Sequence, residues 1–153
     1  MVDRAARMAE IVTEISEGPL DINGAIASVS GEGLGGIAVF IGTVRDSASV
    51  DVNATKPVTR LDYEAHPELA HVRLKKIGED AATKWDVRKV VAIHRTGSCD
   101  LGEPTVVVAC GSPHRRDALE ACRWIIDTIK SEVPIWKREV YAGAGGSAWV
   151  GTP

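Results

Sequence analysis

The strongest constraint on the fold of this chain is a stripe of apolar residues between Pro113 and Pro134. The intervals in the stripe are three, four, three and four residues, and positions three and four apart share one face of an α-helix. Proline is tolerated in the first turn of a helix but cannot continue one, so the two prolines mark its ends. The sequence therefore predicts a long helix that packs through Leu119, Cys122, Ile126, Ile129 and Val133.

Short segments on either side of this helix predict β-strands. Each one is either continuously apolar or alternates between apolar and polar residues, which are the patterns of buried and half-buried strands. Ile37–Ile41 is expected to be buried because of its composition, and Ser98–Pro104 is expected to be a hairpin connection. The predicted strands are Glu10–Ser16, Ile37–Ile41, Val58–Ala65, Lys89–His94, Thr105–Cys110 and Ile135–Tyr141.

Two further helices are predicted. Asp21 can cap a brief helix over Ile22–Val29. Pro67 suits the first turn of a helix that runs to about Trp85. The apolar stripe of this second helix is expected to include Leu69, Val72, Ile77 and Ala81.

The fold class that follows is α+β, with a mostly antiparallel sheet and two main helices. The sequence has no internal repeat and no composition shift that would mark a boundary, so residues 1–153 are expected to form a single domain. Ser47–Lys56 is polar and aperiodic, which predicts a mobile surface loop of the kind that often covers a site.

The charge balance argues against several classes of partner. The 18 Lys and Arg residues are outnumbered by 21 Asp and Glu residues, whereas nucleic acids and acidic membranes attract a net basic surface. No apolar run approaches the ~18 residues of a membrane span. The N-terminus carries Asp3, Arg4, Arg7 and Glu10, where a signal peptide would need an unbroken apolar stretch. We therefore expect a cytoplasmic protein without nucleic-acid or membrane partners.

The cysteines and histidines do not predict a metal site. The three cysteines are an odd number without C-x-x-C spacing, and the four histidines form no H-E-x-x-H motif. Cys110 and Cys122 are expected to be small buried hydrophobic residues, Cys99 to be the most exposed of the three, and His94 to be a core histidine.

The glycine-rich run Gly31–Gly36 formally matches G-x-G-x-x-G. The dinucleotide-binding fingerprint requires a helix after this motif, whereas the predicted strand Ile37–Ile41 follows it here. The run therefore does not predict nucleotide binding.

Three groups of cations are candidates for binding or catalysis. Arg45 follows an apolar strand where the chain enters the long loop; it either contacts a substrate or is solvated or paired. His114 and Arg115 open the long helix, where the macrodipole favours acids. Either they hold an anion together with the free backbone N–H groups, or they are solvated charges balanced by nearby acids. Lys130 and Lys137 lie around the end of the same helix.

Two interpretations of these lysines stay open. Cations near the C-terminus of a helix complement its dipole without any further role. Alternatively, Pro134 and Trp136 supply an apolar wall against which a lysine loses solvation and becomes a better acid, base or nucleophile.

The length of the helix separates the cation groups. Fifteen residues at ~1.5 Å each place Arg115 about 22 Å from Lys130, too far apart for the reacting end of one small ligand. Either the groups serve different sites, or one site is completed across a dimer. We favour the second alternative.

Seven short motifs follow one another through most of the chain. They are Gly42-Thr43-Val44-Arg45-Asp46, Leu61-Asp62-Tyr63-Glu64-Ala65-His66-Pro67, Ile93-His94-Arg95-Thr96-Gly97, Gly102-Glu103, Ser112-Pro113-His114-Arg115, Lys130-Ser131-Glu132-Val133-Pro134-Ile135-Trp136-Lys137-Arg138-Glu139 and Trp149-Val150. In this order they resemble the catalytic (large) subunit family of molybdopterin synthase. The segment that begins at Lys130 is the most specific.

The resemblance implies an α/β-hammerhead-like fold and an enzyme of molybdenum cofactor biosynthesis. Members of the family convert cyclic pyranopterin monophosphate (precursor Z) into molybdopterin by inserting two dithiolene sulfurs. The resemblance also implies a small ubiquitin-like partner that carries the sulfur as a thiocarboxylate on its C-terminal glycine. Two large subunits would form the homodimer at the centre of a heterotetramer, with no tightly bound cofactor.

Residue by residue, the resemblance assigns a role to each matching position. Lys130 and Lys137 correspond to the essential lysines. The substrate-binding positions are Thr43, Val44, Arg45, His114, Arg115, Lys130, Lys137, Arg138 and Glu139. This agrees with the physical argument, because a cyclic phosphate needs fixed cations and acyl transfer needs a stabilised oxyanion.

Two other functions compete with this one. The first is a persulfide sulfurtransferase that acts through Cys99 or another thiol. The second is a dimeric module that holds a phosphorylated small molecule or pterin without performing chemistry on it.

Overall fold

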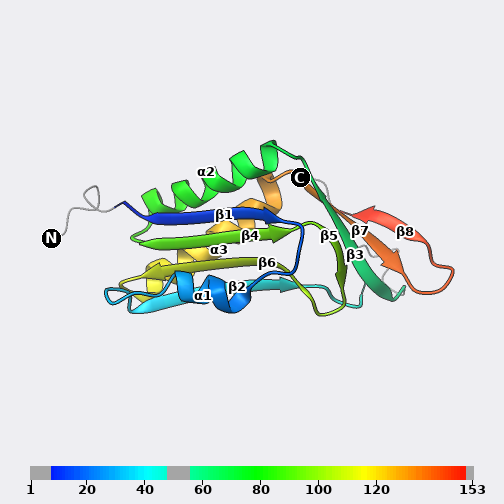
Figure 1. Ribbon diagram of the computed structural model, residues 1–153, viewed down its shortest axis with the longest axis horizontal. Helices are drawn as coiled ribbons and strands as arrows, with labels where there is room; N and C mark the ends of the chain where they lie inside the picture. The colour runs from blue at the N-terminus through cyan, green and yellow to red at the C-terminus, as the bar shows by residue number, and fades with distance from the viewer. Residues whose placement is uncertain (1–7, 48–55, 151–153) are drawn as a thin grey trace.

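The computed structural model describes residues 8–47 and 56–150, and its strands form two four-stranded sheets (Figure 1). The first sheet has the order β1 (Glu10–Ser16), β4 (Lys89–Arg95), β6 (Pro104–Ser112), β2 (Gly36–Thr43). The second has the order β5 (Gly97–Asp100), β3 (Val58–Ala65), β7 (Ile135–Tyr141), β8 (Ser147–Val150). Every pair of neighbouring strands is antiparallel except β1 and β4, which confirms the predicted fold class.

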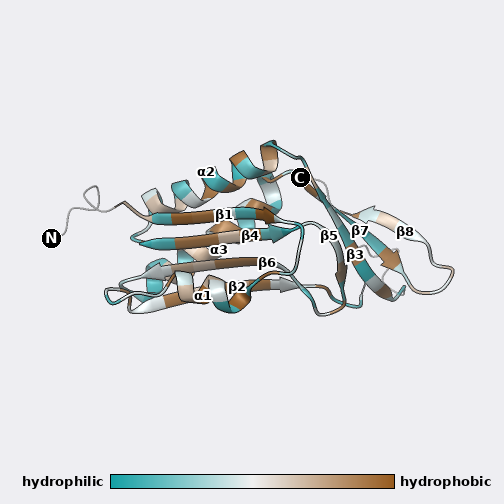
Figure 2. Cartoon of the chain, viewed as in Figure 1, coloured by the Kyte–Doolittle hydropathy of each residue, from teal (hydrophilic) through white to brown (hydrophobic). Residues whose placement is uncertain are grey.

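Three helices cover the first sheet. α2 (Leu69–Lys84) and α3 (Arg115–Glu132) share a core with one face of β4 and β6, while α1 (Ile22–Ser28) packs on the opposite face (Figure 1). The Asp21 side chain accepts a hydrogen bond from the backbone N–H of Gly24 and caps α1, as the sequence predicts. The core therefore lies mainly under the first sheet, and Figure 2 shows the contrast between the apolar middle of β4 and β6 and the more hydrophilic β3 and β7.

The predicted apolar stripes are partly wrong. Leu119 is 59% exposed, and Leu69 and Val72 on α2 are exposed as well. In both helices small residues such as Ala118 and Ala70 take the buried positions, because they let the helix backbone approach the sheet closely. The buried set on α3 is Ala118, Ala121, Cys122, Ile125, Ile126 and Ile129, and the buried set on α2 is Ala70, Leu74, Ile77, Gly78 and Ala81.

The segment predicted as a hairpin connection is longer and more structured than expected. β4 and β6 are antiparallel neighbours, but the chain between them crosses to the second sheet and adds β5 beside β3. This pairing buries Cys99 completely, so the prediction that it is the most exposed cysteine is wrong. Cys110 and Cys122 are buried, as predicted.

The strand predicted as buried lies at a sheet edge. Within residues 8–47 and 56–150, β2 pairs only with β6, and Ile37, Val39, Phe40 and Ile41 keep 37–42% of their surface exposed. Its composition is typical of a central strand, so the sequence alone could not reveal the missing neighbour.

The glycine-rich run has a packing role. A Cβ atom on Gly36 would lie 2.9 Å from the Cα atom of Arg115, so the start of β2 passes directly against the start of α3. A strand follows the run, as predicted, and the fold gives it no dinucleotide-binding helix.

One predicted loop lies mostly outside the described residues, and the prediction about membrane spans can be compared with the described helices. Most of the predicted loop Ser47–Lys56 lies outside the described residues, although its flanks Ser47 and Pro57 form an isolated antiparallel bridge. No helix within residues 8–47 and 56–150 is long and apolar enough to cross a membrane.

Candidate active site

A cavity of about 300 Å³ lies where the end of β2 meets the second sheet. Among the described residues, four charged side chains line it: Arg45 after β2, Lys130 in the last turn of α3, and Lys137 and Glu139 on β7. Three of these four charges are cationic, so the cavity is suited to an anionic ligand.

Local sequence explains how the lysines meet. Val133 ends α3 and Pro134 prevents its continuation, so β7 begins at Ile135 and returns past the end of the helix. Alternate residues of a strand share one face, which places Lys137 and Glu139 together. A register shift between Gly42 and Thr43 interrupts the end of β2, and such irregularities are common next to sites.

Uncharged side chains form the wall of the cavity. Leu61 and Tyr63 of β3 stand opposite Glu139 and Lys137 in the strand register, and Phe40 and Thr105 come from the first sheet. These apolar and hydroxyl groups reduce the access of water to the lysine amines.

Burial lowers the pKa of Lys130, and the positive charge of Lys137 lowers it further. Burial likewise lowers the pKa of Lys137; the Glu139 carboxylate raises it and the Arg45 guanidinium lowers it. Each amine therefore gives up its proton more readily than an exposed lysine does, so the pair can both stabilise charge and move protons.

A neutral histidine lies behind the cavity. His94 is 3% exposed, its Nδ1 atom lies 2.8 Å from the carbonyl oxygen of Arg95, and its ring meets the Tyr63 ring edge-on at 5.1 Å. Burial lowers the pKa of His94 to about 4, and the nearby charge of Lys130 acts in the same direction. The prediction of a satisfied core histidine is confirmed.

The structure brings together five of the predicted site residues. Thr43, Arg45, Lys130, Lys137 and Glu139 line one cavity. Glu139 is 1% exposed and accepts a hydrogen bond of 3.0 Å from the Tyr141 hydroxyl, so its carboxylate is fixed in place.

Other predicted residues lie elsewhere. Val44 is buried in the second hydrophobic core. Arg138 donates to Asp62 at 2.8 Å and lies over the Trp149 ring, on the face of β7 opposite to Lys137. Trp136 shares that opposite face, so the predicted Pro134-Trp136 wall does not form at the lysines.

His114 and Arg115 lie at the far end of α3. The 18-residue helix begins at Arg115, so the predicted separation of about 22 Å from Lys130 applies within one protomer. The Ser112 hydroxyl accepts a hydrogen bond from the His114 N–H and donates one to the His114 carbonyl oxygen, which fixes the start of the helix.

Tyr63, Thr105 and Phe40 also line the cavity, and none of them was predicted from the sequence to do so. Tyr63 had a usable signal, because it shares the parity of Leu61 in the alternating segment Val58–Ala65. Nothing in the sequence indicated Thr105, which reaches the cavity only because β6 lies next to β2.

A buried ion pair supports the segment that carries Arg45. Arg95 pairs with Glu103, whose other carboxylate oxygen accepts a hydrogen bond from the Asp100 N–H. The carbonyl oxygen of Glu103 in turn accepts a hydrogen bond from the Val44 N–H, one residue before Arg45. The pair therefore ties the turn between β5 and β6 to the rim of the cavity.

Glu103→Ala should lower the free energy of unfolding by about 3 kcal/mol, because it leaves the Arg95 guanidinium buried without its partner. Denaturant unfolding measures this effect. The matched control is Glu79→Ala, which removes one member of an exposed helical pair with Lys75 and should change stability by less than about 0.5 kcal/mol. Equal effects in the two variants would contradict a supporting role for the buried pair.

Asp62 links β3 to its neighbours through charge. Burial alone would raise its pKa, but hydrogen bonds from Arg138, Ser98 and Arg60 outweigh burial and lower the pKa from 3.8 to about 2. A depressed carboxyl pKa stabilises the fold above the unfolded value and stops doing so as the pH falls through the folded value.

Asp62→Asn should therefore flatten the loss of stability between about pH 4 and pH 2. After allowance for solvent screening, the ionised Asp62 carboxylate contributes about 1 kcal/mol to the free energy of unfolding. Unfolding measured across this pH range tests it, with the exposed Asp127 changed to Asn as the control. An unchanged pH profile in Asp62→Asn would refute the assignment.

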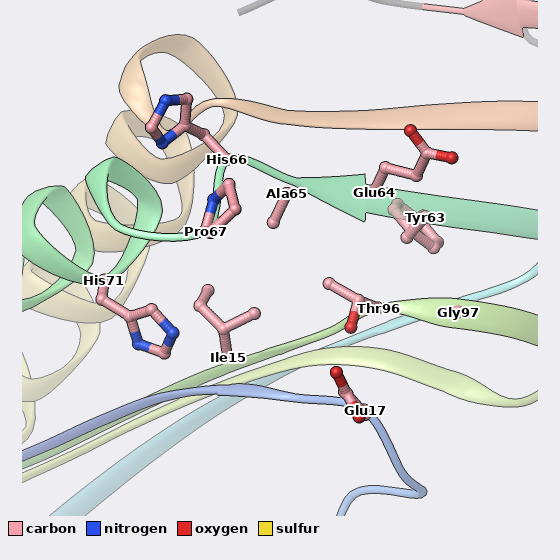
Figure 3. Close-up of a pocket in the computed structure, with 10 residues that line it drawn as sticks. All are labelled: Ile15, Glu17, Tyr63, Glu64, Ala65, His66, Pro67, His71, Thr96 and Gly97. Carbon is pink, nitrogen blue, oxygen red and sulfur yellow. The ribbon is translucent and has the colours of Figure 1, made fainter.

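A larger cavity of about 630 Å³ lies between the end of β1 and the end of β3. Figure 3 shows Glu64 and His66 on one side of it and Glu17 and His71 on the other. None of the described residues that line this cavity is Lys or Arg, so they offer no lasting positive charge to an anionic substrate. In the described part of the chain, no group of three or more His, Cys, Asp or Glu residues is placed to hold a metal ion.

Comparisons with known proteins agree with this geometry. Residues 15–132 match the MoaE protein family. The chain is 38% identical over 151 residues to molybdopterin synthase catalytic subunit 1 of Mycobacterium tuberculosis, covering 94% of this chain and 98% of that protein. It is 41% identical over 120 residues to the molybdopterin synthase catalytic subunit of Pyrococcus abyssi, covering 78% of each. The crystal structure of molybdopterin synthase from Staphylococcus aureus superimposes with a TM-score of 0.79 at 30% identity, covering 99% of each chain.

Proposed function

The chain belongs to the MoaE family of molybdopterin synthase catalytic subunits, and we propose that its lysine-lined cavity converts cyclic pyranopterin monophosphate into molybdopterin. The observation that carries this proposal is the convergence of Arg45, Lys130 and Lys137 on one cavity. Fixed cations are what a cyclic phosphate requires, and the lowered lysine pKa values suit proton transfer.

The sulfur comes from a small ubiquitin-like partner as a C-terminal thiocarboxylate. Its sulfur bonds to a pterin side-chain carbon as a bond from that carbon to oxygen breaks, and the oxygen leaves as water or stays on the opened phosphate. Water then attacks the partner's carbonyl carbon, the carbon–sulfur bond to the partner breaks, and the sulfur stays on the pterin as a thiolate. The partner leaves as a carboxylate, and two such transfers complete the dithiolene. Attack on the carbonyl creates an oxyanion, which a protonated amine stabilises.

The two lysines have different roles in the reaction. Lys130 meets the partner's thiocarboxylate end and stabilises the oxyanion, while Lys137 handles the pterin and its developing charge. Because the Lys137 charge lowers the pKa of the neighbouring Lys130 amine, one amine can stay protonated while the other accepts a proton from water. No tightly bound cofactor is required.

The assembly follows from the distance along α3. His114 and Arg115 cannot reach Lys130 within one protomer, so a second copy supplies them in a homodimer. One small subunit at each end gives a heterotetramer. We assign this assembly to the cytoplasm.

The structure weighs against a cysteine-dependent sulfurtransferase. Cys99, Cys110 and Cys122 are all buried, and burial raises the pKa of the Cys99 thiol. A protonated, inaccessible thiol is a poor nucleophile. A pterin-binding module without chemistry differs from the proposal in one respect: it leaves the sulfur donor unchanged.

The test measures the conversion of the sulfur donor, the thiocarboxylated small subunit. The purified protein is mixed with precursor Z and a thiocarboxylated small subunit, and intact mass spectrometry of the small subunit is recorded over time. We expect thiocarboxylate to become carboxylate only when both precursor Z and this chain are present. A donor that stays thiocarboxylated, with the protein folded and the donor competent with another synthase, would overturn the proposal.

A further inference from the structure

We propose that Tyr141 is a positioning residue of the active site: its hydroxyl holds the Glu139 carboxylate beside Lys137, and this carboxylate keeps Lys137 positively charged for an anionic substrate. The inference rests on the proposed function, because it names the source of a charge that the reaction uses. It is carried by the alignment of the three side chains on β7 and by the burial of Glu139 and Tyr141.

The three side chains form a row on one face of β7. Alternate residues of a strand point to the same face, and Lys137, Glu139 and Tyr141 are each two residues apart. The Tyr141 hydroxyl donates a hydrogen bond of 3.0 Å to Oε1 of Glu139. Lys137 and Glu139 line the cavity, whereas Tyr141 belongs to the second hydrophobic core, which shares Leu61 and Tyr63 with the cavity wall. The row therefore runs from this core into the site.

The surroundings of Tyr141 hold its ring in place. The residue is buried, and its backbone N–H donates a hydrogen bond to the carbonyl oxygen of Gly146 at 2.9 Å. A Cβ atom on Gly145 would lie 2.8 Å from the Cβ atom of Tyr141, so the turn after β7 passes directly against it. The ammonium group of Lys56 lies 5.2 Å from the centre of the ring. A ring that is packed in this way points its hydroxyl in a fixed direction.

Glu139 is the carboxylate that this hydroxyl orients. Because Glu139 is 1% exposed, little water can solvate its charge, and a buried carboxylate depends on hydrogen-bond donors and a nearby cation. The Tyr141 hydroxyl is one such donor, and Lys137 is the cation on the same face of the strand. Without the hydroxyl, the carboxylate can rotate away from the amine and its field at Lys137 weakens.

The groups around Lys137 act on its charge in opposite directions. Burial lowers the pKa of Lys137, the Glu139 carboxylate raises it, and the Arg45 guanidinium lowers it. Lys130 is a further cation of the same cavity, and Tyr63 stands opposite Lys137 in the register of β3 with β7. Among the described residues that line the cavity, Glu139 is the only carboxylate. It is therefore the group that favours a protonated Lys137 before an anion binds.

The charge of Lys137 can be measured without turnover. Only the neutral amine reacts with acetic anhydride, so peptide mass spectrometry of acetylation at several pH values reports how readily Lys137 loses its proton. At a given pH below the pKa of Lys137, Glu139→Gln should make this lysine react about tenfold faster, because the carboxylate charge is gone. Tyr141→Phe should accelerate the reaction about threefold, because the carboxylate remains but is no longer held.

Thr59→Val is the matched control for the lost hydroxyl. The Thr59 hydroxyl donates a hydrogen bond of 3.1 Å to the carbonyl oxygen of Val140, so this variant also removes one hydroxyl contact with β7, at an exposed position. It should leave acetylation of Lys137 unchanged. The exposed Lys75 is the internal reference for the reagent in every sample. A rate at Lys137 that is no faster in Tyr141→Phe than in Thr59→Val would overturn the inference.

The pH profile of molybdopterin formation connects this role to the reaction. In Tyr141→Phe the alkaline limb of kcat should move to lower pH, because Lys137 loses its proton earlier. A purely structural effect would lower kcat by the same factor at every pH, and an unmoved alkaline limb would overturn the role in the reaction.

The outcomes separate this inference from the proposed function. Faster acetylation of Lys137 in Tyr141→Phe supports the positioning of Glu139 even if the sulfur transfer assay fails. If the variant changes neither the acetylation rate nor the pH profile while the thiocarboxylate is still consumed, the proposed function stands and Tyr141 only packs in the core.

Discussion

Lys130→Ala and Lys137→Ala should each reduce molybdopterin formation at least about 100-fold, the usual cost of losing a group that stabilises an oxyanion. Both amines line the same cavity and have lowered pKa values. Because the two lysines have different roles, the one that remains in each variant cannot replace the one that is lost. The loss should fall mainly on kcat, because the affected charge develops in the transition state. Steady-state kinetics with a saturating thiocarboxylated partner measure it.

The matched control for these variants is Lys75→Ala, which removes an exposed lysine of α2 that pairs only weakly with Glu79. It should keep wild-type turnover. All three variants should unfold at similar denaturant concentrations, because neither cavity lysine is part of a hydrophobic core. Near-normal kcat in either cavity variant would remove that lysine from the mechanism.

Mixed dimers of Arg115→Ala and Lys130→Ala should recover activity that neither variant shows alone. A mixed dimer contains one site with both substitutions and one site with neither, if each site combines Lys130 of one protomer with Arg115 of the other. Random pairing then restores about one quarter of wild-type activity. Two different affinity tags and co-expression allow the mixed species to be purified and assayed separately.

The control is a dimer of the double variant Arg115→Ala/Lys130→Ala with wild type, which also has two substitutions but keeps no complete site. It should be inactive, whereas the purified mixed dimer should have about half of wild-type activity. If the double variant with wild type has the half activity and the mixed dimer has none, Arg115 and Lys130 act within one protomer.

Local pattern was sufficient for much of the fold. The strand predicted over Glu10–Ser16 is β1, and those over Val58–Ala65 and Ile135–Tyr141 are β3 and β7. Pro134 correctly predicted the end of α3, and the glycine-rich run Gly31–Gly36 correctly predicted the start of β2. These features depend on residues close together in the chain, where periodicity and turn chemistry decide the outcome.

The errors concern which side of an element is covered. The composition of Ile37–Ile41 is that of a central strand, but the topology leaves β2 at an edge. Cys99 lies in a polar stretch, yet pairing with β3 buries it. Both outcomes depend on strands that are distant in the chain, and local pattern carries no information about them.

The sequence predicted more of the site than of the fold. Arg45, Lys130, Lys137 and Glu139 were assigned from the sequence, and they line one cavity. Strand parity alone would have separated Arg138 from Lys137, because adjacent residues of a strand point to opposite faces. The contribution of Thr105 could not be foreseen, since it requires the neighbouring position of β6.

The most direct test of the central claim is molybdopterin formation from precursor Z and a thiocarboxylated small subunit, followed as the fluorescent oxidation product of molybdopterin. Wild-type protein and Lys130→Ala are assayed side by side. The account predicts product with the wild type and its near-complete loss in the folded variant. Undiminished product from Lys130→Ala would contradict it.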